Sequence, residues 1–251
     1  MTAAPRRDGA RLLARLARTP GDLRAAQGLR HRLFRDRRGL PPRPRGLDAD
    51  DLDPLCRHLL VEDEAGALLG CCRLMLFADG RGLGGSYAAR AHDLSRLAAY
   101  PRPLLEVGRF CALPERDAEA LRAAWGALAA LVDRPAVALL FGCSSFEGTD
   151  PAPHAEALRL LGAAHLGPPR WRPGPGAGEC LPLPTAPPAD PLAALRALPP
   201  LLRSYLAMGG WVGSHAALDR DMATLHVLTA VEIAAIPPAR ARALRALAAP
   251  R

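Results

Sequence analysis

The chain has 251 residues, a formal net charge of +8 and only 4% aromatic residues. This length allows one large domain with a sizeable core, and the longest clean apolar run, residues 136–143, is far too short to span a membrane. All 33 basic residues are arginine, and the excess charge favours an acidic partner such as an anionic membrane surface, nucleic acid or an acidic protein. The scarcity of aromatic side chains argues against a base-stacking surface, so we expect no nucleic-acid partner.

The first part of the chain predicts short strands and helices separated by two loops. In order, the expected elements are a strand or helix start at 12–18, a helix from Gly21 to about Phe34 with Asp22 as N-cap, a long charged loop at 36–54, hairpin strands at 58–62 and 67–77, a Gly-rich loop at 80–85 and a weak helix at 86–98.

The second part continues the alternation of strands and helices. The expected elements are a strand at 104–112, a helix at about 117–132, a strand at 136–146, a helix at about 152–165 capped by Asp150, an irregular stretch at 167–189, helices after Asp190-Pro191 and at 200–208, a strand at 225–233 and a basic amphipathic tail at 238–249. This order predicts an α/β fold with helices around a mixed sheet. We expect one domain over residues 1–251, with about 167–251 as a C-terminal extension on the same sheet.

The segment 104–112 carries two charged side chains inside an apolar strand. In a regular strand, Glu106 and Arg109 would point to opposite faces because they are three residues apart. Gly108 between them favours a bulge, which inserts one residue and re-aims the next side chain. A bulge also leaves main-chain N–H groups unpaired. The segment therefore predicts a carboxylate, a guanidinium and free amide donors close together, a combination suited to acyl transfer.

The six cysteines show no metal-binding or disulfide pattern. No two of them form Cys-x-x-Cys, and no His pair has zinc-finger spacing, so we expect no metal site and a reduced, intracellular chain. Cys143-Ser144-Ser145 leaves two interpretations open. It is either a nucleophile or ordinary packing at a strand end, and the absence of a His at a recognisable spacing favours packing.

Several motifs together carry a family resemblance over about residues 24–235. They are Arg30 and Phe34 in the first helix; Asp50 and Asp53 in the long loop, with Asp48 and Asp51 as a second register; Gly70-Cys71-Cys72-Arg73; Glu106-x-x-Arg109-Phe110; residues 141–146 followed by Gly148-Thr149-Asp150; and residues 198–206 followed by Gly209-Gly210. In these motifs the chain resembles the branch of the GNAT N-acyltransferase superfamily that uses acyl carrier protein. That branch includes acyl-homoserine lactone synthases and ornithine lipid N-acyltransferases.

The resemblance implies both a fold and a reaction. The fold is a mixed, mostly antiparallel central sheet flanked by helices, in which strands 104–112 and 136–146 splay apart to form the acyl-donor slot. The reaction is transfer of a 3-hydroxyacyl group from acyl carrier protein to the α-amino group of L-ornithine, which gives lyso-ornithine lipid. The donor enters through its phosphopantetheine arm and no other cofactor is implied. Residues 114–126 lack the glycines of the coenzyme A pyrophosphate loop, which favours a carrier-protein donor.

The expected site residues fall into a catalytic and a substrate-binding group. The catalytic group is Glu106, Arg109 and Arg73, with Glu106 as the candidate general base. The substrate-binding group is Arg30, Phe34, Asp50, Asp53, Cys143 and Ser144. Two alternatives remain open: Glu106 forms a structural ion pair with Arg109 or Arg73, or the two aspartates belong to a solvated charged loop.

Other functions and the cellular location also follow as expectations. The basic N-terminus lacks the apolar run of a signal peptide, so we expect a cytoplasmic protein with peripheral contact to the inner membrane. The alternatives are an acyl-homoserine lactone synthase or another N-acyl amino acid synthase, and, in a different class, a non-catalytic membrane-binding protein of hemolysin type.

Overall fold

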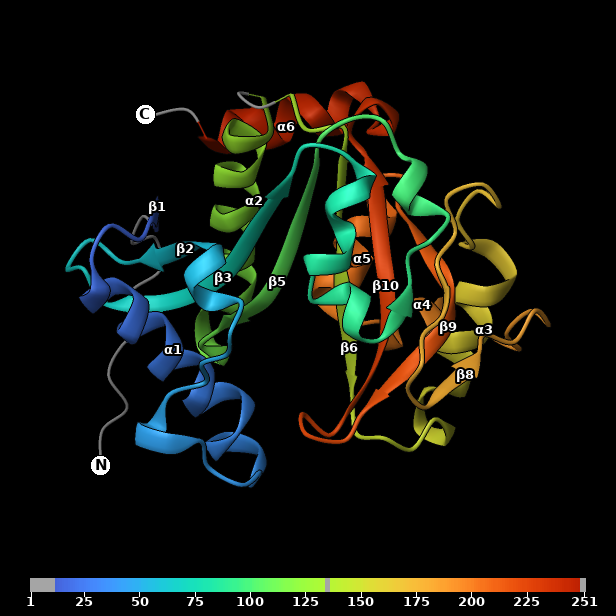
Figure 1. Cartoon of the computed structure of the whole chain (residues 1–251), viewed down its shortest axis with the longest axis horizontal. Coiled ribbons are helices and arrows are strands. Elements are labelled where there is room, and N and C mark those ends of the chain that lie inside the picture. Colours follow the sequence, from blue (N-terminus) through green and yellow to red (C-terminus); the bar gives the residue numbers. More distant parts are fainter. Residues whose placement is uncertain (1–11, 134–135, 249–251) are drawn as a thin grey trace.

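A computed structural model describes residues 12–133 and 136–248, and its centre is an eight-stranded sheet (Figure 1). In spatial order the strands are β1 (Leu13–Leu16), β2 (Arg57–Glu62), β3 (Leu68–Phe77), β5 (Leu104–Ala112), β6 (Leu139–Glu147), β10 (Thr224–Glu232), β9 (Trp211–Asp219) and β8 (Cys180–Pro182). Every neighbouring pair is antiparallel except β5 and β6, which are parallel. The predicted mixed and mostly antiparallel α/β sheet is therefore confirmed.

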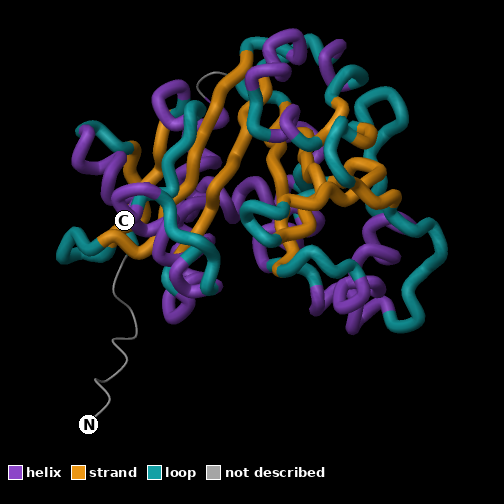
Figure 2. Tube along the Cα trace, turned by 60° about the horizontal axis from the view of Figure 1, so that its bottom comes forward, coloured by secondary structure: helices purple, strands orange, loops and turns teal. Residues whose placement is uncertain are grey.

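Six α-helices accompany this sheet in the described part of the chain. They are α1 (Pro20–Phe34), α2 (Asp117–Asp133), α3 (Ala155–Ala164), α4 (Pro191–Ala197), α5 (Pro200–Ala207) and α6 (Pro238–Ala248). β4 (His92–Asp93) and β7 (Gly174–Pro175) pair as a separate two-stranded ribbon, which packs against the main sheet. Figure 2 shows the strands running through the middle of the molecule, with helices and loops on either side.

Alternating side chains of the first strands fill two separate cores. On β2, Leu59 and Val61 are buried in the cluster that contains Trp125 of α2. Leu60, between them, is buried in the cluster that contains Leu29 of α1. Because strand side chains alternate between faces, this pattern places α1 and α2 on opposite faces of the sheet.

The sequence predicted an N-cap residue for each of α1, α3 and α4. The structure confirms one of them and corrects the other two. Thr19, and not Asp22, is the N-cap of α1, because its side chain accepts from the Asp22 N–H while Asp22 accepts from the Thr19 N–H in a capping box. Asp150 is not the N-cap of α3: it accepts from the Ala152 N–H before a 3₁₀ turn at Ala152–His154, and α3 begins later, at Ala155. Asp190 is the N-cap of α4 as predicted, accepting from two main-chain N–H groups.

The observed secondary structure also differs from the prediction where contacts with other segments, and not the local residue preferences, determine it. The weak helix expected at 86–98 consists of 3₁₀ turns at Ala88–Arg90 and Leu97–Ala99 with β4 between them. Within the segment 12–18, residues Leu13–Leu16 form a strand, β1. The strand β9 was not predicted, because its sequence contains Gly and small residues and its β structure depends on pairing with β8 and β10. The tail forms α6 to Ala248, and position 249 lies outside the described residues.

Candidate active site

The predicted bulge is present in β5. The pairing between β3 and β5 passes from Cys71 opposite Cys111 to Arg73 opposite Gly108, so β5 contains one extra residue there. Arg109 occupies that position with φ 54°, in the left-handed region that L residues rarely adopt. This irregularity turns the Arg109 side chain away from the position that a regular strand would give it.

Strands β5 and β6 separate immediately beyond this region. They are paired from Leu104 opposite Leu139 to Glu106 opposite Phe141, and no pairing follows. At the last contact, a Cβ added to Gly142 would lie 2.1 Å from the Val107 carbonyl oxygen, so only glycine fits there. Figure 1 shows the two strands diverging toward the lower part of the view. Their facing edges beyond Val107 therefore offer main-chain groups that have no strand partner.

A cavity of about 320 Å³ occupies the space between the separated strands. Five of the nine predicted site residues line it: Phe34, Glu106, Arg109, Cys143 and Ser144. Arg30, Arg73, Asp50 and Asp53 do not line it. They belong instead to a buried ion-pair cluster linked to the cavity through Arg109. The predicted set thus divides into residues at the cavity and residues that support it.

Glu106 is held by main-chain amides. Its carboxylate accepts hydrogen bonds from the N–H groups of Tyr87 at 3.0 Å and Ala88 at 2.8 Å. Within residues 12–133 and 136–248 it forms no ion pair with Arg109 or Arg73, although the positive charge of Arg73 acts on it from a greater distance. Burial raises the pKa of the Glu106 carboxyl above its ordinary value. A buried carboxylate with a raised pKa beside a cavity fits a general base.

The buried ion-pair cluster joins α1, the long loop and two strands. Asp53 lies 2.7 Å from Arg30 and 3.0 Å from Arg73, and Asp50 lies 2.5 Å from Arg73 and 3.5 Å from Arg109. Asp53 is only 2% exposed, so a solvated charged loop does not describe it.

Asp48 and Asp51 are the aspartates of the alternative motif register, and only Asp48 belongs to the buried cluster. Asp48 joins the same cluster at 3.2 Å from Arg30, whereas Asp51 lies at the surface and pairs with Arg90.

Charge pairing within this cluster keeps Asp53 ionised. Burial alone would raise the pKa of the Asp53 carboxyl, but hydrogen bonds and charges from Arg30, Gln27 and Arg73 outweigh burial and hold that pKa below its ordinary value. Two donors of the arginines remain unused, because Arg73 Nη2 and Arg109 Nε are buried without a hydrogen-bond partner among the described residues. Arg109 Nε faces Asp48 Oδ2 at 3.9 Å, and of these two arginines only Arg109 lines the cavity, where its guanidinium can meet an anionic group of a bound substrate.

Tyr87 and Asp219 are two of the polar residues of the cavity wall that sequence reasoning missed. The Tyr87 hydroxyl donates to Asp219 Oδ2 at 3.1 Å, and the Arg109 guanidinium carbon lies 5.0 Å from the centre of the Tyr87 ring. Both Tyr87 and Asp219 line the cavity. The signal for Tyr87 was a single aromatic residue after a Gly-rich loop. Asp219 gave no signal, because the strand that positions it, β9, was not recognised.

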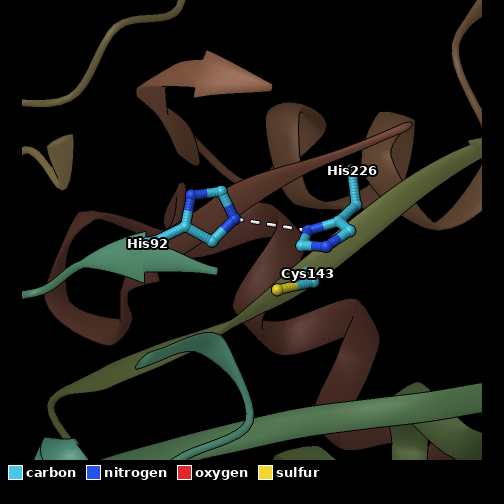
Figure 3. Close-up of side chains that lie close together, drawn as sticks. All are labelled: His92, Cys143 and His226. Carbon is cyan, nitrogen blue, oxygen red and sulfur yellow. Dashed lines mark hydrogen bonds between the residues drawn. The ribbon is translucent and has the colours of Figure 1, made fainter. Parts of the chain in front are cut away.

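Cys143 and Ser144 lie on β6 in different surroundings. Ser144 is buried and its hydroxyl accepts a hydrogen bond from Thr229 at 3.1 Å, an arrangement typical of packing between strands. Cys143 has two histidines beside it, His92 and His226, which sequence spacing could not reveal (Figure 3). Burial raises the pKa of the Cys143 thiol, so the free thiol is protonated and is a poor nucleophile.

The fold and this cavity define an acyltransferase of the GNAT type, and residues 29–126 match the family model described as an acetyltransferase (GNAT) domain. An L-ornithine N(alpha)-acyltransferase of Rhodobacter capsulatus is 34% identical over 233 residues, 88% of this chain and 90% of that protein. The protein of the same name from Brucella abortus is 32% identical over 238 residues, 88% of this chain and 84% of that protein. The chain belongs to the L-ornithine N(alpha)-acyltransferase family.

Two further findings accompany this assignment. A CoA-dependent acyl-homoserine lactone synthase of known structure shows a TM-score of 0.48 and 16% identity, covering 97% of this chain and 92% of the other. Among the described residues, none of the helices combines the length and the apolar character that crossing a bilayer requires.

Proposed function

We propose that the protein transfers a 3-hydroxyacyl group from acyl carrier protein to the α-amino group of L-ornithine and so forms lyso-ornithine lipid. The observation that carries this proposal is the cavity between β5 and β6, which has Glu106 in its wall. The acceptor is supported by the names of relatives that align over most of their length. This is the first of two acylations needed for a complete ornithine lipid.

The proposed chemistry uses groups on both sides of the β5 bulge. The neutral α-amine attacks the thioester carbonyl, the tetrahedral intermediate collapses with cleavage of the C–S bond, and Glu106 accepts the proton that the amine loses and passes it to the departing pantetheine sulfur, which leaves as a thiol. Unpaired main-chain N–H groups at the edge of β5 stabilise the tetrahedral oxyanion. Removing one such donor costs about 3–4 kcal/mol of barrier in other acyl-transfer enzymes. No acyl-enzyme is required, consistent with a protonated Cys143 thiol.

The two charges of ornithine match two side chains of the cavity wall. Arg109 lines the cavity, and its guanidinium is suited to bind the α-carboxylate. Tyr87 contacts both charged residues, because its hydroxyl donates to Asp219 and its ring lies beside the Arg109 guanidinium. Asp219 is suited to bind the δ-ammonium group. Binding of both the α-carboxylate and the δ-ammonium group would position the α-amine of ornithine for attack.

Acidic residues at the start of α2 favour acyl carrier protein as the donor. The first turn of this helix contains Asp117 and Glu119, and Asp117 lines the cavity. These carboxylates would repel the pyrophosphate of coenzyme A at a helix N-terminus that otherwise attracts anions. A carrier-protein donor brings one phosphate in place of several, and the net charge of +8 attracts an acidic carrier. The thioester is then a co-substrate and no further cofactor is needed.

We also propose peripheral contact with the cytoplasmic face of the inner membrane, where an amphiphilic product would be released. Its support is α4, which exposes Leu192 at 64% and Leu195 at 41% on a positively charged protein. The basic tail is less suited to this role, because α6 packs on α2, where Leu247 lies against Gly126.

The test is a reaction of purified protein with 3-hydroxyacyl carrier protein and either L-ornithine or S-adenosylmethionine, analysed by mass spectrometry. We expect Nα-acylated ornithine and no acyl-homoserine lactone. Lactone formation would establish the autoinducer synthase alternative, and acylation of a different amino acid would refute the acceptor. The non-catalytic, hemolysin-type alternative no longer applies, because the chain belongs to an enzyme family.

A further inference from the structure

Three potential metal ligands meet at one point beside the cavity. His92 comes from β4, Cys143 from β6 and His226 from β10, and their ligand atoms all lie within 4.8 Å of one another (Figure 3). His92 Nε2 and His226 Nδ1 are 3.3 Å apart. Both histidines are only 3% exposed. Three distant parts of the sequence thus bring two imidazoles and a thiol together inside the protein.

We propose that His92, Cys143 and His226 form a binding site for a zinc-class transition metal ion in the wall of the acyl-transfer cavity. Nitrogen and sulfur donors of this kind favour Zn²⁺ over Mg²⁺ or Ca²⁺, which prefer oxygen ligands. The proposal concerns this chain's own side chains and does not depend on which acyl group or amine the enzyme uses.

The spacing of the two histidines fits tetrahedral coordination. With Zn–N bonds of about 2.0–2.1 Å, two imidazole nitrogens on a tetrahedral ion are about 3.3–3.4 Å apart. The separation between His92 and His226 is 3.3 Å. With a Zn–S bond of about 2.3 Å, a thiolate would be about 3.5 Å from each nitrogen. Because the ligand atoms lie within 4.8 Å of one another, the Cys143 sulfur needs to approach each nitrogen by at most about 1.3 Å, which is within the reach of a side-chain rotation.

Protonation also favours the metal. Both imidazoles are buried, and the neutral imidazole is the form that binds metals. The Cys143 thiol gives up its proton when the ion binds, because a thiolate is the ligand. Asp219 faces this group and its negative charge favours a bound cation, whereas Arg109 opposes it.

A metal at this point would connect the two sides of the active site. It would tie β4 to β6 and β10, and β4 follows the short segment whose Tyr87 and Ala88 amides hold Glu106. Cys143 itself lines the cavity. Three protein ligands leave a fourth tetrahedral position for water or another small ligand. Without a metal, the two histidines would be linked only by a hydrogen bond, and Cys143 would have no part in the arrangement.

The test measures metal binding directly. Protein stripped of metal is titrated with Zn²⁺ in competition with a chromophoric chelator, and with Co²⁺ followed by absorption. We expect one Zn²⁺ per chain and a thiolate-to-cobalt charge-transfer band. Because loss of a partner outside the coordination shell already costs about 10–100-fold in affinity, Cys143→Ser and His92→Gln should weaken Zn²⁺ binding by more than about 100-fold. Cys143→Ser should also abolish the charge-transfer band.

Matched controls use residues of the same types elsewhere in the chain. Cys180→Ser and His154→Gln should bind Zn²⁺ as the wild type does, since neither residue belongs to the cluster. Circular dichroism verifies that every variant is folded. A wild-type protein that takes up no Zn²⁺, or a Co²⁺ complex without the thiolate band, overturns the proposal whether or not the variants fold. Binding that requires the histidines but not Cys143 overturns the proposed ligand set.

Discussion

Replacing Asp53 with Asn tests whether the buried ion-pair cluster holds the loop beneath the active site. Arg30 donates two hydrogen bonds to this carboxylate, at 3.0 and 2.7 Å, and Arg73 and Gln27 donate one each, at 3.0 and 2.8 Å. The Arg30 side chain is 1% exposed and that of Asp53 is 2% exposed. Asn has the same shape but no charge, and its NH₂ group would face an arginine donor.

The expected loss is large because two buried arginines would each lose a counter-charge. Among the described residues, Arg30 would keep only Asp48 and Arg73 would keep only Asp50 as an ion-pair partner. Removing one partner of a buried pair costs about 3–5 kcal/mol of unfolding free energy. For a chain of this size that corresponds to a fall in Tm of about 6–20 °C. Urea unfolding followed by circular dichroism measures the loss as a lower midpoint at unchanged slope. Asp51→Asn is the matched control, since Asp51 pairs with Arg90 at the surface, and its unfolding curve should overlay that of the wild type.

The effect of Asp53→Asn should also depend on pH with a defined sign. The pKa of Asp53 is lowered in the folded protein, so its stabilising contribution is complete above the ordinary value of 3.8 and is lost as pH falls through the lowered pKa. The difference between wild type and Asp53→Asn should therefore be constant near neutral pH and shrink below 3.8. A loss of less than about 1 kcal/mol at neutral pH, the size typical of exposed pairs, would refute the reasoning.

Three further predictions concern the cavity and the strands around it. Because burial raises the pKa of Glu106 above its ordinary 4.5, kcat/KM should fall on the acid side with an apparent pKa above 4.5. Glu106→Gln should lower the rate about 10²–10⁴-fold and remove that limb of the pH profile. Gly142→Ala should cost about 1–3 kcal/mol in urea unfolding, since its Cβ would meet the Val107 carbonyl oxygen. Tyr87→Phe should cost about 1 kcal/mol by removing the hydrogen bond to Asp219, measured in the same way.

Local sequence signals predicted those parts of the fold that local chemistry determines. Gly108 inside an apolar strand indicated the bulge, and the β3–β5 pairing shows it beside that residue. Asp190-Pro191 indicated the start of α4, because the aspartate accepts from the first N–H groups and proline suits the first helical turn. The motif residues Arg30, Asp50 and Asp53 meet as a charged cluster, although the sequence left their register open.

Features that depend on distant pairing were beyond the sequence. β9 contains Gly213 and Ser214, which have little strand preference, and it is stable because β8 and β10 flank it. His92 and His226 are 134 residues apart and meet only when β4 folds against β10. No short spacing motif records such a meeting, so the sequence alone did not indicate this cluster.

Filling the space between β5 and β6 tests the central claim most directly. A Cβ at Gly108 would meet nothing within 4 Å, and Gly108 lines the cavity, so Gly108→Leu should fold normally and obstruct the acyl slot. Gly178→Leu is the matched control, because Gly178 is equally open but does not line the cavity. With 3-hydroxyacyl carrier protein and L-ornithine as substrates, we predict that Gly108→Leu keeps the wild-type Tm and loses acyl transfer, while Gly178→Leu keeps both. A Gly108→Leu protein with wild-type kcat/KM would contradict the account.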